Sequence, residues 1–381
     1  MLPRRSLRHA EANLPHMIHW RSGVVREVTR ARRGAVRLRV EVDGADVPAL
    51  ALTEVVGSPE PGDEVLLNIS ALRRGLGTGG MALVVADVTR PPADPADGPG
   101  HIVKARYTPL QQMVQTLEEQ ESPHHETMRE HPDIAGGDLR GLPVVVAELH
   151  SALPAVLAGI RSVAPQARVG YVMTDSAALP FALSDSAARL VEAGWLATTI
   201  TAGQAYGGEH EAITVHSALL AARHVLRCDV VVVAQGPGNA GSSTTWGWSG
   251  LSTGDVLNAV HVLRGRGVVV PRVSGSDPRP RHVGLSHHTA TVLSRALLGG
   301  ADVVVADSTD APWPDVREQL ETAISTSAGA PHLVPLPLDG VAEALATSPV
   351  PLTSMGRSAT EDVTPFVTAA LAGRHAAALL P

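Results

Sequence analysis

Seven short apolar segments, each followed by a helix-forming stretch, run through residues 141–381 and constrain the fold more than any other feature. The run of four valines at 230–233 leaves no polar side chain for a solvated face, so both faces of that strand should be buried. Such strands, alternating with helices, predict an α/β domain with a Rossmann-like, doubly wound, mostly parallel sheet. The predicted strands are 143–149, 168–174, 196–201, 229–235, 267–273, 302–306 and 332–337. The predicted helices lie near 151–161, 184–193, 214–226, 252–264, 287–299, 314–327, 340–347 and 361–379.

The first ninety residues have a different pattern. Five short segments alternate apolar with polar residues between Gly, Asp and Pro, which predicts a small antiparallel β-barrel of the SH3-like or OB-like type. A Pro-rich stretch then precedes TPLQQMVQTLEEQ at 108–120, which has an N-cap threonine and a helical spacing of apolar residues. The expected division is 1–16 as a disordered extension, 17–90 as the β-barrel, 91–140 as a linker with a helix and a His-containing loop at 121–126, and 141–381 as the Rossmann-like domain.

The charge distribution and the cysteine content limit which partners and which cellular location are expected. The net charge is −7, yet residues 1–39 hold ten Arg against two Glu. We interpret this as a solvated basic face, so a nucleic-acid partner is not expected. Cys228 is the single cysteine, which predicts a reducing, cytoplasmic location. There is no apolar run of the roughly 18–20 residues that span a membrane, and the N-terminal residues lack an apolar core, so neither a membrane span nor a secretory signal is expected. By analogy with similar α/β proteins, a homodimer is expected.

A glycine-rich loop, GPGNAGSS, follows the strand at 229–235. It matches G-x-G-x-x-G, but a proline stands in the turn and the next helix begins about ten residues later, so an NAD or NADP site is disfavoured. The open alternatives are an anion bound by backbone N–H groups and a purely structural turn. Trp246 and Trp248 could form a stacking wall beside it. The predicted ligand-binding residues are Gln235, Gly236, Gly238, Asn239, Gly241, Ser242, Ser274 and the only lysine, Lys104.

Two adjacent histidines, His287 and His288, open the predicted helix at 287–299, with Ser286 as its N-cap. The positive end of a helix favours neutral imidazole, which can act as a general base. Adjacent helical residues diverge by about 100°, so one histidine should face the cleft. The alternative is one buried and one surface histidine without chemistry. Asp175 and Asp307 follow two other strands and are predicted to orient the base or to bind a metal.

Glu148 and His150 stand at the end of the first strand of the sheet, on the same side if that strand continues to residue 149. With Asp175 or Asp307 they would form a nitrogen and oxygen ligand set suited to zinc or manganese. There is no H-E-x-x-H motif to support this metal site. The sequence does not identify the cofactor, and the two candidates are a divalent metal and a nucleotide.

Several distinctive segments carry a resemblance to a known family. They are KARYTPLQ at 104–111, ESPHHE at 121–126, LHSALPAVLAG at 149–159, YVMTD at 171–175, VVAQGPGN at 232–239 and RVSGSDPR with GLSHHT within 272–289. On these segments the chain resembles DUF3866, an uncharacterised family common in actinobacteria, over about 17–378. The resemblance implies one architectural unit over that range, and it brings no activity, cofactor or catalytic residue with it.

The predicted function is that of an enzyme with a cleft at the carboxyl ends of the strands for a small anionic metabolite, with phosphorylated compounds and nucleotides among the candidates. A transferase or a hydrolase is favoured over a dehydrogenase. The alternative is a non-catalytic regulatory module, in which the barrel contacts a protein or nucleic acid and the α/β domain senses a ligand. The histidines and aspartates at the strand ends favour the enzyme, and the basic N-terminal stretch favours the module.

Overall fold

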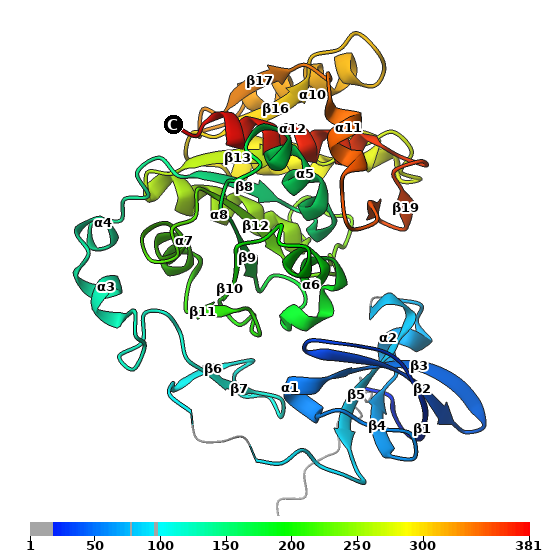
Figure 1. The fold of residues 1–381 in the computed structure, drawn as a ribbon. Helices are drawn as coiled ribbons and strands as arrows, with labels where there is room; N and C mark the ends of the chain where they lie inside the picture. Colours follow the sequence, from blue (N-terminus) through cyan, green and yellow to red (C-terminus); the bar gives the residue numbers. More distant parts are fainter. Residues whose placement is uncertain (1–17, 77, 95–97) are drawn as a thin grey trace, which may run out of the picture. The chain divides into compact units, whose positions relative to one another are not determined.

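The computed structural model describes residues 18–76, 78–94 and 98–381 (Figure 1). The chain divides into two compact units, Met1–Asp94 and Pro95–Pro381. The extension predicted for 1–16 lies outside the described residues. Within the described ranges, no helix combines the length and the apolar character needed to cross a membrane.

The first unit contains a closed barrel of five strands in the order β1-β2-β3-β5-β4. The alternation of apolar and polar residues in the sequence corresponds to an alternation of buried and partly exposed side chains. In β2, Val36, Leu38 and Val40 are buried. Arg37 and Arg39, which lie between them, are partly exposed. The elements are β1 (Trp20–Arg32), β2 (Ala35–Val42), β3 (Ala45–Leu52), α1 (Thr53–Val56), β4 (Glu64–Asn68), α2 (Ser70–Arg73), η1 (Thr78–Gly80) and β5 (Ala82–Asp87).

The prediction of an antiparallel barrel is wrong for one pair of strands. β3 and β5 pair in parallel, with Ala49 opposite Ala82 and Leu50 opposite Leu83. Parallel neighbours need a long connection, and the chain between them, through α1, β4 and α2, supplies it.

The chain from 98 to 142 does not form the helix predicted near 108–120. It forms a hairpin, and positive φ angles at Ala105 (49°) and Tyr107 (60°) turn the chain between its strands. The apolar residues at helical spacing do not share one buried face, since Leu110 and Met113 are exposed and Leu117 is buried. Strand pairing has therefore overridden a weak helical pattern. The elements are β6 (Ile102–Lys104), β7 (Gln112–Val114), α3 (His125–Glu130) and α4 (Pro132–Ala135).

The rest of the second unit is organised by an eight-stranded sheet in the order β11-β10-β9-β12-β8-β13-β16-β17. Every neighbouring pair is parallel. All residues of β8, β9 and β12 are buried, as their valine-rich sequences predict. The strands are β8 (Pro143–Ala147), β9 (Val169–Thr174), β10 (Thr198–Ala202), β11 (His210–Ala212), β12 (Val230–Gln235), β13 (Arg266–Val270), β16 (Asp302–Ala306) and β17 (His332–Leu336). The seven predicted strands are confirmed within a few residues, and β11 is added to them.

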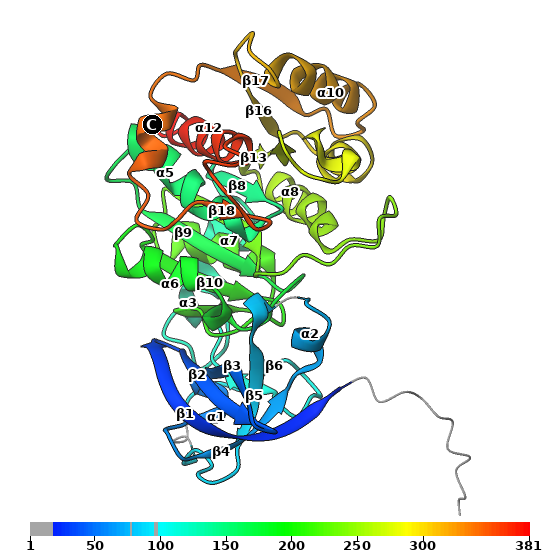
Figure 2. The same ribbon diagram turned by 90° about the vertical axis from the view of Figure 1, so that its right-hand side faces the viewer.

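Helices cover both faces of the sheet, with α5 and α12 on one side of β8 and β13 and α8 and α10 on the other (Figure 2). The helix predicted at 287–299 is shorter than expected, because α9 ends at Thr291 and a π-helical turn, η6, continues to Ala296. The helices are α5 (Leu153–Val163), α6 (Asp185–Glu192), α7 (Val215–His224), α8 (Ser252–Val262), α9 (His287–Thr291), α10 (Trp313–Ser325), α11 (Val341–Ala346) and α12 (Thr364–Ala378).

Two glycines let α5 and α12 approach each other closely. A Cβ atom on Gly159 of α5 would lie 2.0 Å from Ala370 O of α12. A Cβ atom on Gly373 of α12 would lie 2.0 Å from Val156 O of α5. Because both contacts are with backbone carbonyls, a larger residue can be accommodated only if the helices move apart.

We therefore expect Gly159→Ala to destabilise the second unit by at least about 2 kcal/mol, even though alanine favours a helix. Gly300→Ala is the matched control, because Gly300 is exposed and its added Cβ would meet its nearest heavy atom only at 4.0 Å. The measurement is the midpoint of chemical denaturation. Equal midpoints for the two variants would contradict the close packing of α5 on α12.

Candidate functional site

Polar residues gather at the carboxyl ends of the three central strands, β12, β8 and β13. Gln235 ends β12, Glu148 directly follows β8, and Arg272 lies just beyond β13. The chain adds β9, β10 and β11 on one side of β8 and, after β12, adds β13, β16 and β17 on the other. In open α/β sheets, ligand sites form at such a reversal, so this edge is the candidate site.

The Glu148 carboxylate is the centre of this edge. Its Oε1 accepts hydrogen bonds from Arg272 Nη1 at 2.6 Å, Asn239 Nδ2 at 2.7 Å and His288 Nδ1 at 2.6 Å. Its Oε2 is buried and has no hydrogen-bond partner among the described residues. An ionised carboxylate can only accept, so His288 carries its hydrogen on Nδ1 and presents the lone pair of Nε2 when neutral.

The neighbouring loop is shaped to hold Glu148. A Cβ atom on Gly250 would lie 2.3 Å from Glu148 Cγ, so glycine is needed for the carboxylate to reach its place. Gln235 Nε2 donates to Glu148 O at 3.1 Å. Ser249 Oγ donates to Asn239 Oδ1 at 2.6 Å, which turns the amide nitrogen of Asn239 towards the carboxylate.

Three histidine rings, those of His282, His287 and His288, lie together beside this carboxylate. Their ring centroids are 4.4, 4.9 and 5.1 Å apart, and one nitrogen from each ring lies within 4.8 Å of the other two. Trp248 stacks on His288 at a centroid distance of 3.8 Å. His282 Nδ1 is 2.7 Å from Ser286 Oγ. His287 Nε2 is buried and unpartnered in the described part of the chain.

The expectation that one of the two adjacent histidines would turn away from the site does not hold, because both rings lie in the three-histidine cluster. Both residues belong to α9, which begins at His287 directly after the extended residue Ser286 (φ −62°, ψ 138°). Their rings meet edge to face, with 4.4 Å between the centroids.

Burial and charge set the protonation of this centre. Burial alone would raise the pKa of the Glu148 carboxyl, but the His288 hydrogen bond and the Arg272 charge outweigh it and lower the pKa. Burial lowers the pKa of His282 to about 3, with the Arg272 charge as the next cause. Burial also lowers the pKa of His287. His282 and His287 are thus neutral imidazoles at neutral pH.

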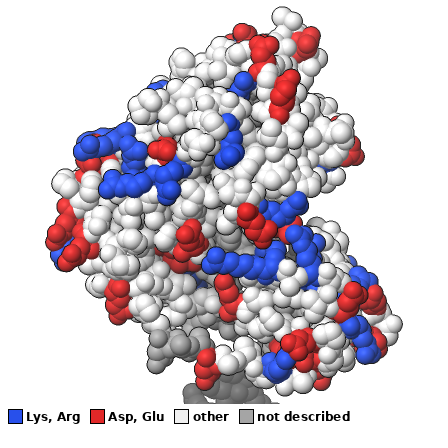
Figure 3. Space-filling model, viewed as in Figure 1, with Lys and Arg blue, Asp and Glu red and all other residues white. Residues whose placement is uncertain are grey.

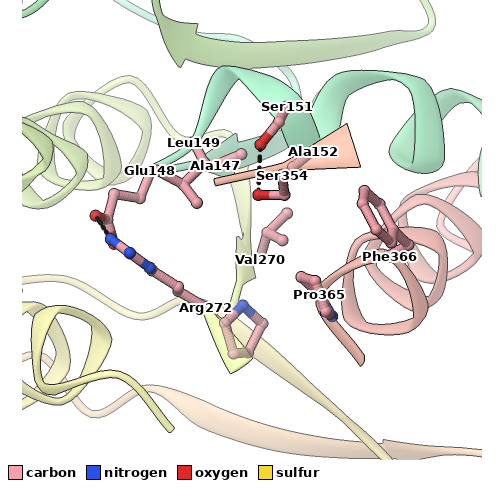
Figure 4. A pocket seen from close by; sticks show the side chains of 11 residues that line it. Ala147, Glu148, Leu149, Ser151, Ala152, Val270, Arg272, Ser354, Pro365 and Phe366 are labelled. Atoms are coloured by element: carbon pink, nitrogen blue, oxygen red, sulfur yellow. Dashed lines mark hydrogen bonds and ion pairs between the residues drawn. The ribbon is translucent and has the colours of Figure 1, made fainter. Parts of the chain in front are cut away.

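Two small cavities flank Glu148. The first, of about 20 Å³, lies between β8, β13 and the start of α12, and holds the hydrogen bond between Ser151 and Ser354 (Figure 4). In this view the Glu148 carboxylate turns away from the serines, towards Arg272. The second, of about 10 Å³, lies between β8, β12 and α8. Each has room for about one water molecule, so neither is the cleft for a metabolite that the sequence predicts, and the Glu148 carboxylate lies in a buried polar centre.

A second charge network lies beside the first. Ser274 Oγ donates to Asp362 Oδ2 at 2.5 Å, so the hydroxyl predicted to bind ligand is engaged. Asp277 pairs with Arg279 at 2.8 Å and with Arg357 at 3.2 Å. The Arg279 hydrogen bond lowers the pKa of Asp277 despite partial burial. This network holds the β14–β15 hairpin (Val273–Ser274 and Gly284–Leu285), which carries the chain to His287.

The glycine loop contacts the centre through two of its predicted residues. Gln235 and Asn239 bond to Glu148 as described. Gly236 N points to Thr174 O at 3.4 Å, within the backbone. The remaining predicted residues form an exposed turn: Gly238, Gly241 and Ser242.

The two predicted aspartates lie away from the histidines. Asp175 is exposed and accepts from Gln204 N at 2.8 Å, which holds the loop after β10. Asp307 is exposed and pairs with Arg317 of α10 at 2.7 Å. Neither contacts a histidine of the cluster in the described residues.

Glu148 and His150 do not form the predicted ligand pair. β8 ends at Ala147, and His150 begins a 3-10 turn, so the two side chains no longer share one side of a strand. His150 Nδ1 is 3.0 Å from Tyr171 Oη and its Nε2 is 2.5 Å from Ser184 Oγ. Both nitrogens are engaged, and burial lowers the pKa of His150 to about 4.

Lys104, predicted to bind ligand, is a buried structural residue. Its Nζ donates to Thr201 O at 2.8 Å, Ala205 O at 2.8 Å and Glu211 Oε2 at 2.7 Å, which uses all three of its hydrogens. It joins the β6–β7 hairpin to the edge of the sheet.

The sequence places His282 among the polar residues beyond the strand 267–273, but it assigns no role to His282 or to Arg272. Arg272 is one of 31 Lys and Arg residues. The only sequence feature that could have indicated its role is its position directly after the apolar segment ending in VVVP. His282 precedes the histidine pair by several residues, and only the turn at 280–286 brings it back to them.

Removing one partner of a buried ion pair leaves the other charge uncompensated, so Lys104→Met should destabilise the second unit by roughly 3–5 kcal/mol. The double variant Lys104→Met, Glu211→Leu should recover much of this loss. Chemical denaturation checks both. If the double variant unfolds as easily as the single one, the pairing with Glu211 is not what Lys104 provides.

The comparison with family models bears on the whole of this site. The family model described as protein of unknown function (DUF3866) matches residues 48–373, a range that contains Glu148, Arg272 and the three histidines. None of the curated proteins compared with the chain matches it. Because the matched range covers most of the chain, the protein belongs to the DUF3866 family.

Proposed function

We propose that the protein is an enzyme, a hydrolase or a transferase, that acts on a small anionic metabolite at the centre formed by Glu148, Arg272 and His288. The observation that carries this proposal is the buried carboxylate that holds His288 by Nδ1. A histidine oriented in this way is a Lewis base at Nε2, towards a proton or towards a metal ion. Such a group can activate water in a hydrolase or an acceptor hydroxyl in a transferase.

The fold supports a ligand site here. We infer that the parallel sheet is of the Rossmann-like, doubly wound type, since strands are added in opposite directions on the two sides of β8. The Glu148 centre lies at the reversal point, where proteins of that type bind their ligands.

The charges nearby support an anionic ligand. Four arginines stand at this edge against three carboxylates, those of Glu148, Asp277 and Asp362. The arginines are Arg272, Arg279, Arg281 and Arg357. Polar residues are otherwise rare in the central strands, so their concentration here points to chemistry rather than to packing. We also propose a cytoplasmic location, where the buried free thiol of Cys228 stays reduced.

The competing proposal is a binding module that acts through the barrel. A closed five-stranded barrel is typical of OB-like domains, many of which bind oligonucleotides. The charge pattern argues against it. Residues 18–94 carry ten arginines and ten acidic residues, and Arg26 pairs with Glu41 and Arg39 with Asp46. On the face in Figure 3, basic and acidic side chains are interspersed.

To test the enzyme proposal, purified protein is incubated with a metabolite extract, and consumed compounds are identified by mass spectrometry. We expect His288→Asn to slow the turnover of any such compound by at least about 100-fold, the smallest usual contribution of a positioned acid or base. His216→Asn is the matched control, because His216 is an exposed residue of α7. Undiminished turnover in His288→Asn would refute the assignment of the active site to this centre, whereas a wild-type protein that consumes no compound would favour the binding module.

A further inference from the structure

We propose that His282, His287 and His288 bind a divalent transition-metal ion of the zinc type, through one imidazole nitrogen each. The proposal deepens the proposed function, because the ion would be the group that activates the nucleophile. The binding itself stands on the geometry of the three rings and does not require that the protein be an enzyme.

The positions of the nitrogens suit such an ion. One nitrogen of each ring lies within 4.8 Å of the others. A tetrahedral zinc ion with bonds of about 2.0–2.1 Å needs its nitrogens roughly 3.4 Å apart. Small changes in side-chain torsion angles would supply the difference, since the three rings come from one short turn and the first residues of α9.

The hydrogen bonds around the cluster leave one nitrogen of each ring available for metal binding. His288 is held by Glu148 at Nδ1 and His282 by Ser286 at Nδ1, so each presents Nε2. His287 Nε2 is buried and finds no partner in the described residues, which has a free-energy cost unless a ligand occupies it. Ligand histidines usually have such a second partner, most often a carboxylate, that fixes the ring.

The charges explain why the ion would take an anionic substrate. Glu148 balances the charge of Arg272, and Asp277 balances that of Arg279. A metal-bound imidazole carries no charge of its own, so three histidine ligands would leave the double charge of the ion uncompensated. A site with three protein ligands keeps a fourth position open, and an anionic group or a hydroxide would occupy it.

Two other groups of potential ligands are less suited to a metal. In the first, His131 Nδ1 accepts from Asp133 N at 3.3 Å, His224 Nε2 is bound to Asp138 O at 2.7 Å, and Asp133 pairs with Arg140 at 2.6 Å. In the second, Glu119 and Glu121 accept from backbone N–H groups. Both groups are already engaged in structural bonds, whereas the cluster of His282, His287 and His288 has a buried nitrogen, His287 Nε2, without a partner in the described residues.

The test is a titration of the full-length protein, freed of metal with a chelator, with zinc chloride in a calorimeter. We expect one equivalent to bind to the wild type, and His287→Ala to weaken the affinity by at least about 100-fold, more than the usual loss for a second-shell partner. His287→Ala removes no hydrogen bond from the Glu148 centre, and circular dichroism verifies its fold. His282→Ala is the second ligand variant and should lose zinc equally.

His131→Ala is the matched control, from the competing cluster, and should bind zinc as the wild type does. Glu148→Gln should bind about 10–100-fold more weakly, as a second-shell change does. Absence of a stoichiometric site, or loss of it in His131→Ala with retention in His287→Ala and His282→Ala, overturns the proposal. That result leaves the enzyme proposal standing, since turnover is measured separately. Conversely, a protein that binds zinc but consumes no metabolite retains the metal site and loses the enzyme proposal.

Discussion

The polar centre at the carboxyl ends of the central strands depends on the burial of one negative charge, that of Glu148. Moving a carboxylate out of water costs several kcal/mol, and the pairing with Arg272 offsets this only if further donors satisfy the remaining lone pairs. The parallel register, with Ala147 opposite Val270, places the residues that follow β8 and β13 side by side. A slip of one residue would turn the Glu148 side chain to the other face of the sheet. The valine-rich packing of the strands therefore also fixes the geometry of the site.

The same packing explains why most of the fold can be predicted from the sequence. Strands such as Val230–Gln235 are buried on both faces, so their apolar runs are long and unambiguous. The hairpin at 102–114 is a different case. Leu110 and Met113 have the spacing of apolar residues on one face of a helix, although both side chains are exposed. The hairpin is joined to the sheet by Lys104, whose partners lie about a hundred residues away in the sequence. Local pattern carries no information about such a contact.

The candidate site is predictable only in part. The rule that ligands bind beyond the carboxyl ends of strands selects Glu148, Gln235, Asn239 and the histidine pair, and the structure brings these together. The rule selects Asp307 equally, yet β16 is separated from β8 by β13, and Asp307 turns to Arg317. Which strand ends become neighbours depends on the insertion of β12 between β9 and β8. That order follows from the packing of the whole domain and cannot be read from any one segment.

Two buried ion pairs in the second unit show how a structural charge differs from one available for chemistry. Glu211 is fully satisfied: Oε2 accepts from Lys104 and Thr201, and Oε1 accepts from Gly207 N. Glu148 takes three donors on Oε1 and none on Oε2 in the described residues. Selection for stability alone would favour a donor for Glu148 Oε2, since an unsatisfied buried oxygen costs about 1–3 kcal/mol of folding free energy. One centre that holds both an unsatisfied carboxylate oxygen and an unpartnered histidine nitrogen is what a site requires when its last partner is a ligand.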